Sequence, residues 1–333
     1  MEKNLQPKQK SLTCHKCQNK AVIKLQHGGM CKHHFITYFE DKVFKTINKY
    51  KLINYKDRIC VAASGGKDSL TALYLVKKYF IKNKFPLNDL NALIINEGIA
   101  DYRDKTLQDL KNFCNEHEIH LTIASFQEQF GKTLDQAFPI INKETKKKPC
   151  NICGVWRRYL LNKYAKQLNA TKLVTGHNLD DESQAVLMNQ FKANTKLAAK
   201  LGPISGIEDH TDFVRRIKPL YFCSEKETRL YTLLKGFKVE YTECPNIVQS
   251  YRAEVRDLLN NFEEKYPGTK TSIINSFLDI LPLLKERQLQ ELKSAKQTTY
   301  IKSCQQCNEP CNGTICNACK LQNTLNEKLK TEK

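Results

Sequence analysis

The amino-acid sequence predicts a doubly wound α/β fold with a parallel sheet, and three observations support this prediction. Apolar runs that suit buried strands alternate with segments of helical spacing through residues 59–241. A glycine-rich turn follows the first apolar run and precedes a helix. Paired cysteines lie near both ends of the chain, outside the alternating region, and predict small zinc modules there.

The elements follow from the spacing of apolar residues. The first strand is expected at 59–62, and the helix after the glycine turn carries one apolar face, formed by Leu70, Leu73, Val76 and Phe80. A further helix is expected from about Asp104, and further strands at residues 91–96, 119–125, 172–176 and 237–241. Ligands of doubly wound sheets bind at the carboxyl ends of the strands, where the turns at 63–70, 96–98 and 176–181 would converge.

The glycine-rich turn reads Ala-Ser-Gly-Gly-Lys-Asp-Ser-Leu over residues 63–70. Two adjacent glycines let backbone N–H groups approach an anion, and the following helix adds a partial positive charge at its N-terminus. Further hydrogen-bond donors come from Ser64, Lys67 and Ser69. The spacing is not that of a Walker A motif. The turn therefore predicts a nucleotide phosphate site, with a plain glycine turn as the alternative.

An acidic pair, Asp180 and Asp181, stands at the head of the helix that follows residues 172–176. Carboxylates at this place could simply cap the helix. Carboxylates that face a triphosphate are unfavourable unless a divalent cation bridges them to it, so the pair also indicates Mg²⁺. We favour the magnesium interpretation.

Fourteen cysteines without an apolar leader segment indicate metal ligation in a reducing compartment. The N-terminal pairs offer four tetrahedral zinc ligands, which are Cys14, Cys17, Cys31 and His34. The C-terminal pairs have zinc-ribbon spacing, with ligands Cys304, Cys307, Cys316 and Cys319. His33 is an alternative to His34, and Cys311 is an additional thiol without a ligand role.

The middle pair, Cys150 and Cys153, has no second pair nearby. We expect a distant third ligand, with Cys244 as the first choice and Cys223 as the second. Three thiolates can hold a cubane iron–sulfur cluster and leave one iron open for sulfide. A redox pair or an incomplete zinc site would use the same residues, and the sequence does not decide between these alternatives.

Together these motifs resemble the zinc-finger-containing tRNA 2-thiouridine synthetases of the TtcA/TtuA group, which have the fold of the PP-loop (N-type) ATP pyrophosphatases, similar to the adenine nucleotide alpha hydrolases. The match spans nearly the whole chain in the family's order. The resemblance implies a tRNA sulfurtransferase that adenylates the 2-carbonyl oxygen of a uridine and replaces it with sulfur. It also implies ATP, Mg²⁺, two Zn²⁺ ions and a [4Fe-4S] cluster on Cys150, Cys153 and Cys244.

The resemblance also assigns residues. Catalytic roles fall on Asp181, Cys153, Cys244 and Arg157, although Arg157 is followed by Arg158, which suits phosphate contact better than proton transfer. The ATP-binding positions implied by the motifs are Ala62, Ala63, Ser64, Gly65, Gly66, Lys67, Asp68, Ser69, Asn96, Gly176 and Asp181.

Charge supports an RNA substrate, because 54 basic residues against 35 acidic ones leave a net charge of +19. Four lysines precede Cys150 within residues 143–148, and the zinc modules carry Lys16, Lys20, Lys24 and Lys302. The longest apolar stretch, 273–284, is interrupted and too short for a membrane span, so we expect no membrane partner and a cytoplasmic location. The sulfur donor could be sulfide, a persulfide or a thiocarboxylated carrier protein, and a homodimer is compatible with the sequence.

The target nucleoside is argued from composition. The chain is rich in Asn, Gln and Cys, which indicates a mesophilic source. In the resembling family T-loop thiolation is a heat adaptation, so we favour the wobble uridine. Alternatives are thiolation of a T-loop uridine or a cytidine, amidation with ammonia, and a non-catalytic zinc adaptor that binds tRNA.

The predicted organisation has six parts. These are an N-terminal zinc finger (1–36), a linking helix (37–54), the PP-loop domain (55–246), a helical appendage (247–298), a zinc ribbon (299–324) and a frayed tail (325–333). The helical appendage is predicted from two apolar faces separated by Tyr266, Pro267 and Gly268. The first face is expected to consist of Val255, Leu258, Leu259 and Phe262, and the second of Ile273, Phe277, Ile280 and Leu284.

Overall fold

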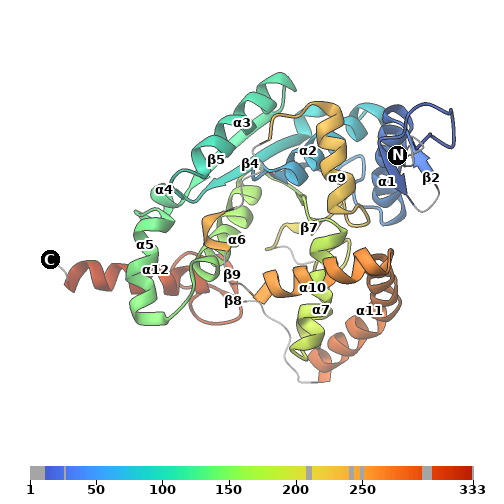
Figure 1. Ribbon diagram of the computed structural model, residues 1–333. Coiled ribbons are helices and arrows are strands. Elements are labelled where there is room, and N and C mark those ends of the chain that lie inside the picture. The colour runs from blue at the N-terminus through green and yellow to red at the C-terminus, as the bar shows by residue number, and fades with distance from the viewer. Residues whose placement is uncertain are drawn as a thin grey trace, which may run out of the picture.

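A computed structural model describes residues 12–25, 28–207, 212–239, 244–247, 251–294 and 302–331. Its centre is a five-stranded parallel sheet of order β5-β4-β3-β6-β7 (Figure 1). The strands are β3 (Ile59–Ala62), β4 (Leu90–Asn96), β5 (His120–Ser125), β6 (Lys172–Thr175) and β7 (Arg215–Ile217). The predicted fold class is confirmed. The order reverses direction next to β3, which is where doubly wound sheets bind ligands.

Successive residues of each strand face opposite helical layers. In β3, Ile59 and Val61 enter one core cluster and Cys60 enters the other. The first layer contains α1 (Lys32–Lys49), α2 (Lys67–Lys82), α3 (Arg103–Glu116) and α9 (Glu225–Lys235). The second contains α4 (Phe126–Phe130), α5 (Leu134–Thr145), α6 (Pro149–Gln167) and α12 (Asn317–Thr331).

A third group of helices lies below the sheet in Figure 1. It consists of α7 (Leu179–Phe191), α8 (Thr195–Ala198), α10 (Tyr251–Lys265) and α11 (Thr269–Ser294). Three of them, α7, α8 and α11, share an apolar cluster of their own, and α10 packs against α7 and α11. The predicted break between the last two helices is confirmed. The inward faces differ in part from the expected ones, because α10 contributes Val255 and Leu259 to the interior and leaves Leu258 and Phe262 exposed.

Two short hairpins lie near the two ends of the described chain. β1 (Ile23–Leu25) pairs with β2 (Gly28–Met30), and β8 (Lys302–Ser303) pairs with β9 (Pro310–Cys311). Short 3₁₀ turns cover Leu87–Asp89 and Pro245–Ile247. The helix after the first hairpin begins at Lys32 rather than at residue 37, because its first turn includes His34. None of the helices in the described part of the chain is long and apolar enough to cross a membrane.

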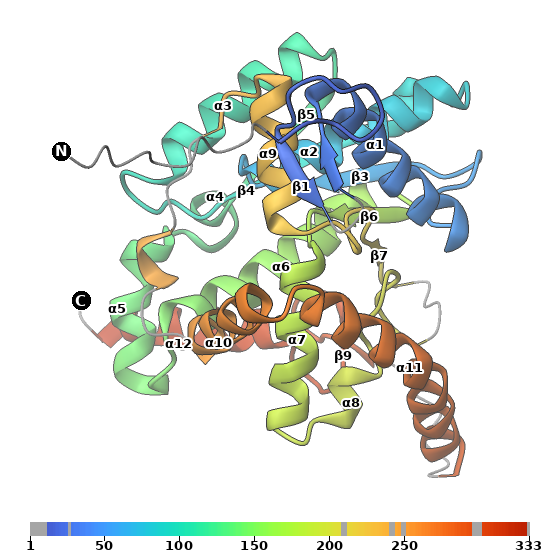
Figure 2. The ribbon, with the colours of Figure 1, turned by 45° about the vertical axis from the view of Figure 1, so that its right-hand side comes forward.

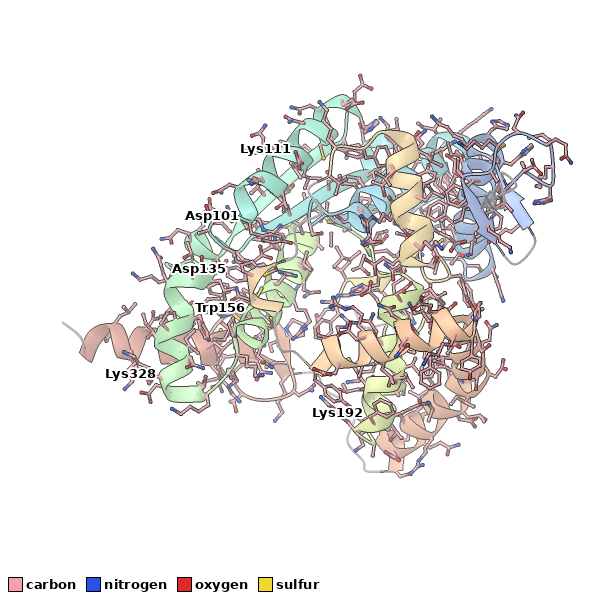
Figure 3. All side chains as sticks on the ribbon, in the orientation of Figure 1. Asp101, Lys111, Asp135, Trp156, Lys192 and Lys328 are labelled. Atoms are coloured by element: carbon pink, nitrogen blue, oxygen red, sulfur yellow. The ribbon has the colours of Figure 1, made fainter. Side chains whose placement is uncertain are left out.

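The expected frayed tail from residue 325 is a wrong prediction. α12 continues to Thr331, and the Leu325 side chain is fully buried among residues of the second layer. Lys328 forms an ion pair with Glu144 of α5 at 2.8 Å. In Figure 3, Lys328 on α12 and Trp156 on α6 lie in the same part of the molecule. Most positions of this segment are charged or polar, so its sequence predicts a solvated tail. The few apolar residues lie on one face of α12 and are buried against the second layer.

The expected strand at 237–241 is not formed where the structure describes it. Phe237–Val239 is irregular, and residues 240–241 lie outside the described residues. The Phe237 ring instead packs edge-on against Phe113, with centroids 5.2 Å apart. The fifth strand is β7, whose short sequence Arg-Arg-Ile gives too little apolar pattern to be recognised (Figure 2).

Candidate active site

A cavity of about 280 Å³ opens at the carboxyl ends of β3, β4 and β6. Ligand pockets of doubly wound folds occur at this edge of the sheet. Seven of the eleven predicted ATP-binding residues line it, namely Ala62, Ala63, Ser64, Asp68, Ser69, Gly176 and Asp181. The other lining residues are Leu93, Ile95, Glu97, Arg103, Arg157, Leu161, Thr175 and His177.

The phosphate loop owes its shape to glycines at two close approaches. Gly65 has φ +84°, and a Cβ there would lie 2.4 Å from the Thr106 carbonyl oxygen. A Cβ on Gly176 would lie 2.8 Å from the backbone nitrogen of Ser69, so only glycine lets the β6–α7 turn approach the loop. The Ser69 hydroxyl accepts from the Ser64 backbone nitrogen at 3.0 Å, which closes the loop. Asp68 and Ser69 of the first turn of α2 line the cavity, so the positive N-terminal end of this helix lies beside it, as phosphate binding requires.

Four predicted ATP-binding residues lie outside the cavity lining. Gly65 and Gly66 shape the loop. The Lys67 ammonium pairs with Asp68 at 2.9 Å and Glu225 at 2.8 Å, and is therefore directed towards α9. The Asn96 side chain accepts from the Gly98 backbone nitrogen at 2.9 Å and so stabilises its own turn.

The acidic pair divides into a structural and a cavity-facing residue. The buried Asp180 carboxylate accepts from Lys270 of α11 and from the Glu225 backbone nitrogen, which occupies its oxygens. Asp181 lines the cavity, yet one of its oxygens also accepts from the Asn178 backbone nitrogen at 3.3 Å in a capping box. Burial raises the pKa of Asp181, and Arg252 opposes that shift. Capping and a role in the cavity therefore coexist in Asp181.

Cys150 and Cys153 lie at the N-terminal end of α6, which has no acidic residue in its first turn. Cys150 is exposed and donates its thiol to the Asn246 carbonyl oxygen at 3.1 Å, whereas Cys153 is buried. Arg157, one turn further on, lines the cavity and donates from Nη2 to Cys153 Sγ at 3.3 Å. Burial raises the pKa of Cys153 to about 11, against the lowering effect of Arg157.

The structure brings Cys244, and not Cys223, to this pair. Cys244 packs against the same core cluster as Cys153, and its charge affects the pKa values of both Cys150 and Cys153. Cys223 is fully buried in the cluster on the opposite face of the sheet. Within the described residues these three thiols are not all within 4.8 Å of one another, unlike the ligands of a single ion. Two thiols at the positive end of α6 and a third that acts on both offer the three thiolate donors that an iron–sulfur cluster can use.

Both predicted four-ligand clusters assemble. In each, all four ligand atoms lie within 4.8 Å of one another, as Cys14, Cys17, Cys31 and His34 and as Cys304, Cys307, Cys316 and Cys319. Burial raises the pKa of Cys14, but donation from backbone N–H groups outweighs it and lowers the pKa to about 5. Hydrogen bonds to Cys304 likewise outweigh its burial and lower its pKa to about 6. Thiolates are the form that binds metal.

Sequence reasoning missed two buried charged residues at the centre of the site. Glu97 is 1% exposed and Arg103 is 2% exposed, and both line the cavity. Glu97 stands in the turn from which we selected Asn96, so a buried charge beside a glycine was the signal that could have identified it. Arg103 lies in the first turn of α3, where nothing in the sequence marks it as buried.

The chain is similar to known proteins over most of its length. The family model described as PP-loop domain matches residues 36–261. A protein of Pyrococcus horikoshii named tRNA-5-methyluridine(54) 2-sulfurtransferase is 35% identical over 93% of this chain and 93% of its own. The tRNA 2-thiolation protein NcsA of Haloferax volcanii is 32% identical over 93% and 98%. The solved structure of the U34-tRNA thiolase NcsA from Methanococcus maripaludis, with its [4Fe-4S] cluster, has a TM-score of 0.75 at 31% identity over 94% and 96%.

The fold and the glycine loop define a PP-loop protein of the ATP pyrophosphatase type. Within that class, the chain belongs to the family of tRNA 2-thiolation sulfurtransferases. The resemblance inferred from the motifs is thereby confirmed.

Proposed function

We propose that this protein is an ATP-dependent enzyme that replaces the 2-carbonyl oxygen of the tRNA wobble uridine with sulfur. One observation carries the proposal: Arg157 lines the nucleotide cavity and donates a hydrogen bond to Cys153. Activation by ATP and delivery of sulfur must act on the same carbon atom. Arg157 belongs to the cavity wall and contacts a thiol, so the nucleotide and the sulfur donor would lie on either side of the same residue, which suits that requirement.

The reaction has two steps. The 2-carbonyl oxygen attacks the α-phosphate of ATP and pyrophosphate leaves, and a sulfur nucleophile then displaces the adenylated oxygen with release of AMP. Backbone N–H groups of the loop, with Ser64 and Ser69, would hold the phosphates. Asp68 and Asp181 line the same cavity. Burial raises the pKa of Asp68, and the negative charge of Asp181 raises it further. Two neighbouring carboxylates in a phosphate site suit a bridging Mg²⁺.

We assign Cys150, Cys153 and Cys244 to a [4Fe-4S] cluster, which supplies an open iron for sulfide when it is bound. The alternative is a persulfide on Cys153 or Cys244. The donor would be sulfide, a persulfide or a thiocarboxylated carrier protein. We assign one Zn²⁺ to each four-ligand cluster, because four close thiol and imidazole ligands suit a tetrahedral ion.

Two arginines whose charges act on residues of the cavity wall, Arg158 on Arg157 and Arg216 on His177, support a tRNA substrate. The Arg158 guanidinium lies beside Gly154, where a Cβ added to the glycine would be 3.4 Å away from it. Burial lowers the pKa of Arg216, and the nearby positive charge of Arg158 lowers it further. Within the described part of the chain, neither arginine pairs with a carboxylate. Guanidinium groups without partners suit RNA phosphates. Since relatives carry the name cytoplasmic tRNA 2-thiolation protein 1, we place this enzyme in the cytoplasm.

A T-loop uridine is the second candidate substrate. The observation that favours it is the identity with the Pyrococcus horikoshii protein, whose name specifies 5-methyluridine 54. Mass spectrometry of nucleosides from tRNA of a deletion strain separates the two. Loss of the wobble 2-thiouridine alone supports our proposal, and loss of a T-loop thiouridine alone contradicts it.

The chemistry is tested by ATP-dependent release of pyrophosphate in the presence of tRNA. Ser64→Ala should weaken nucleotide binding and abolish thiolation, because the Ser64 hydroxyl and backbone form the loop. Metal content of the variant serves as the control for folding. A Ser64→Ala protein with the wild-type rate of thiolation would refute the ATP site.

A pair of cysteine variants tests the third ligand. Cys244→Ala should lose the iron chromophore and thiolation but retain nucleotide binding. Cys223→Ala should stay active, because its thiol is buried on the opposite face of the sheet. An active protein without iron would favour the persulfide, and a dead Cys223→Ala beside an active Cys244→Ala would show that the third ligand was chosen wrongly.

A further inference from the structure

Glu97 is a buried carboxylate shared by two arginines. It lies in the turn after β4, where its backbone carbonyl accepts from Leu134 at 2.7 Å. Its side chain is 1% exposed, with Oε2 at 2.6 Å from Arg103 Nη2 and Oε1 at 2.6 Å from Arg157 Nη2. A carboxylate removed from water needs such partners, so its position is fixed by both guanidinium groups.

Each arginine makes a second contact with a different part of the site. Arg103 Nη1 donates to the Ser64 carbonyl oxygen of the phosphate loop at 2.8 Å. Arg157 Nη2 donates to Cys153 Sγ at 3.3 Å. One continuous line of contacts therefore crosses the site, and we term it the Glu97 network. Its members, in order, are Ser64, Arg103, Glu97, Arg157 and Cys153. It connects the loop that would hold ATP to one of the three thiols that we assign to sulfur delivery.

The two arginines of the Glu97 network differ in how exposed their side chains are. Arg103 is almost fully buried, with 2% of its side chain exposed, whereas 42% of the Arg157 side chain is exposed. Arg157 also lines the nucleotide cavity, so a triphosphate there would attract its guanidinium away from Cys153. Within the described residues, Glu97 is the carboxylate that forms an ion pair with Arg157, and this pairing opposes the attraction of the phosphates.

We propose that Glu97 is a positioning residue that keeps Arg157 on Cys153 while ATP occupies the cavity, and so couples adenylation to sulfur transfer. This inference rests on the proposed function for its second half only. Without the Glu97 charge, Arg157 would bind the phosphates: nucleotide would bind more tightly, and the adenylated uridine would form but would not receive sulfur.

The first experiment needs no tRNA. Calorimetry with α,β-methylene ATP on the full-length protein, with metal content matched between variants, should give a Glu97→Gln affinity about threefold or more above wild type, because the Arg157 guanidinium is then released to pair with the phosphates. The additional change Arg157→Ala should abolish that gain. Glu128→Gln, an exposed change of the same type, is the matched control and should bind as wild type does. Weaker binding by Glu97→Gln, or a gain that survives Arg157→Ala, overturns the inference.

The second experiment measures the ratio of pyrophosphate released to thiouridine formed. In Glu97→Gln this ratio should rise about tenfold, because adenylation continues while sulfur transfer loses its geometry. A merely structural defect would lower both products together and leave the ratio unchanged, which would overturn the coupling role. If wild-type protein itself releases no pyrophosphate with tRNA, the proposed function fails, and calorimetry still decides whether Glu97 holds Arg157.

Discussion

The two four-ligand clusters are each built from two pairs of ligands with the same spacing inside the pair, but they have different surroundings in the fold. The N-terminal cluster adjoins α1, and its neighbours Ile23 and Met30 join the core on the α2 and α9 side of the sheet. In the C-terminal cluster, Cys304 and Cys316 themselves belong to the core on the α6 side. Because α6 also carries Cys150 and Cys153, the C-terminal four-ligand cluster shares a core with the helix of the proposed iron–sulfur cluster, whereas the N-terminal one adjoins the other core.

The two modules therefore differ in how far they belong to the α/β domain. Trp156 of α6 is fully buried and donates its indole nitrogen to the Ala318 carbonyl oxygen of α12 at 3.3 Å. The same ring stacks on Phe130, with centroids 4.1 Å apart. The C-terminal module is thus part of one layer of the domain, and the N-terminal module adjoins the other layer.

Cys316→Ser is expected to have the largest effect. Cys316 is a buried ligand, so the change should release the C-terminal metal and expose the core around α12. We expect loss of iron binding and of thiolation together with a large fall in melting temperature. Metal analysis and thermal unfolding measure this, and a variant that keeps its iron would show that α6 does not depend on the C-terminal metal site.

Trp156→Ala tests the same contact without touching a metal ligand. Removing a fully buried aromatic side chain should lower the free energy of unfolding by about 3–5 kcal/mol. Denaturant unfolding provides the measurement, with Leu233→Ala as a control because that leucine is 57% exposed. Equal stability of the two variants would mean that α6 and α12 do not depend on each other.

Cys17→Ser should affect binding rather than chemistry. The variant should lose the N-terminal metal, while affinity for α,β-methylene ATP stays within about twofold of wild type, because the module adjoins the layer opposite to the thiols. If this module holds tRNA, the affinity for tRNA should fall several-fold in a filter-binding assay. A tRNA affinity equal to that of wild type would assign the module to another partner.

Much of the site could be predicted from sequence because its parts are local. The glycine loop, the helix after it and the cysteine pairs depend on neighbours a few residues apart, so their spacing alone indicates their structure. Glu97 and Arg103 could not be predicted in the same way, because their roles come from contacts with Arg157 and Ser64, which are distant in the chain. The helix at residue 325 was missed for a related reason, since the surface that buries Leu325 belongs to α5 and α6.

Cys311→Ser should have the smallest effect and sharpens the comparison within the C-terminal module. Cys311 lies between two ligand pairs but is not among the four atoms that could hold a metal. Its thiol donates to the Gly313 carbonyl oxygen at 2.9 Å, and a serine hydroxyl can donate in the same way. We expect unchanged metal content and a change in the free energy of unfolding within about 0.5 kcal/mol, as for other surface substitutions. A loss of metal from Cys311→Ser, measured beside Cys316→Ser, would show that the ligand set includes Cys311 and that the spacing had been misread.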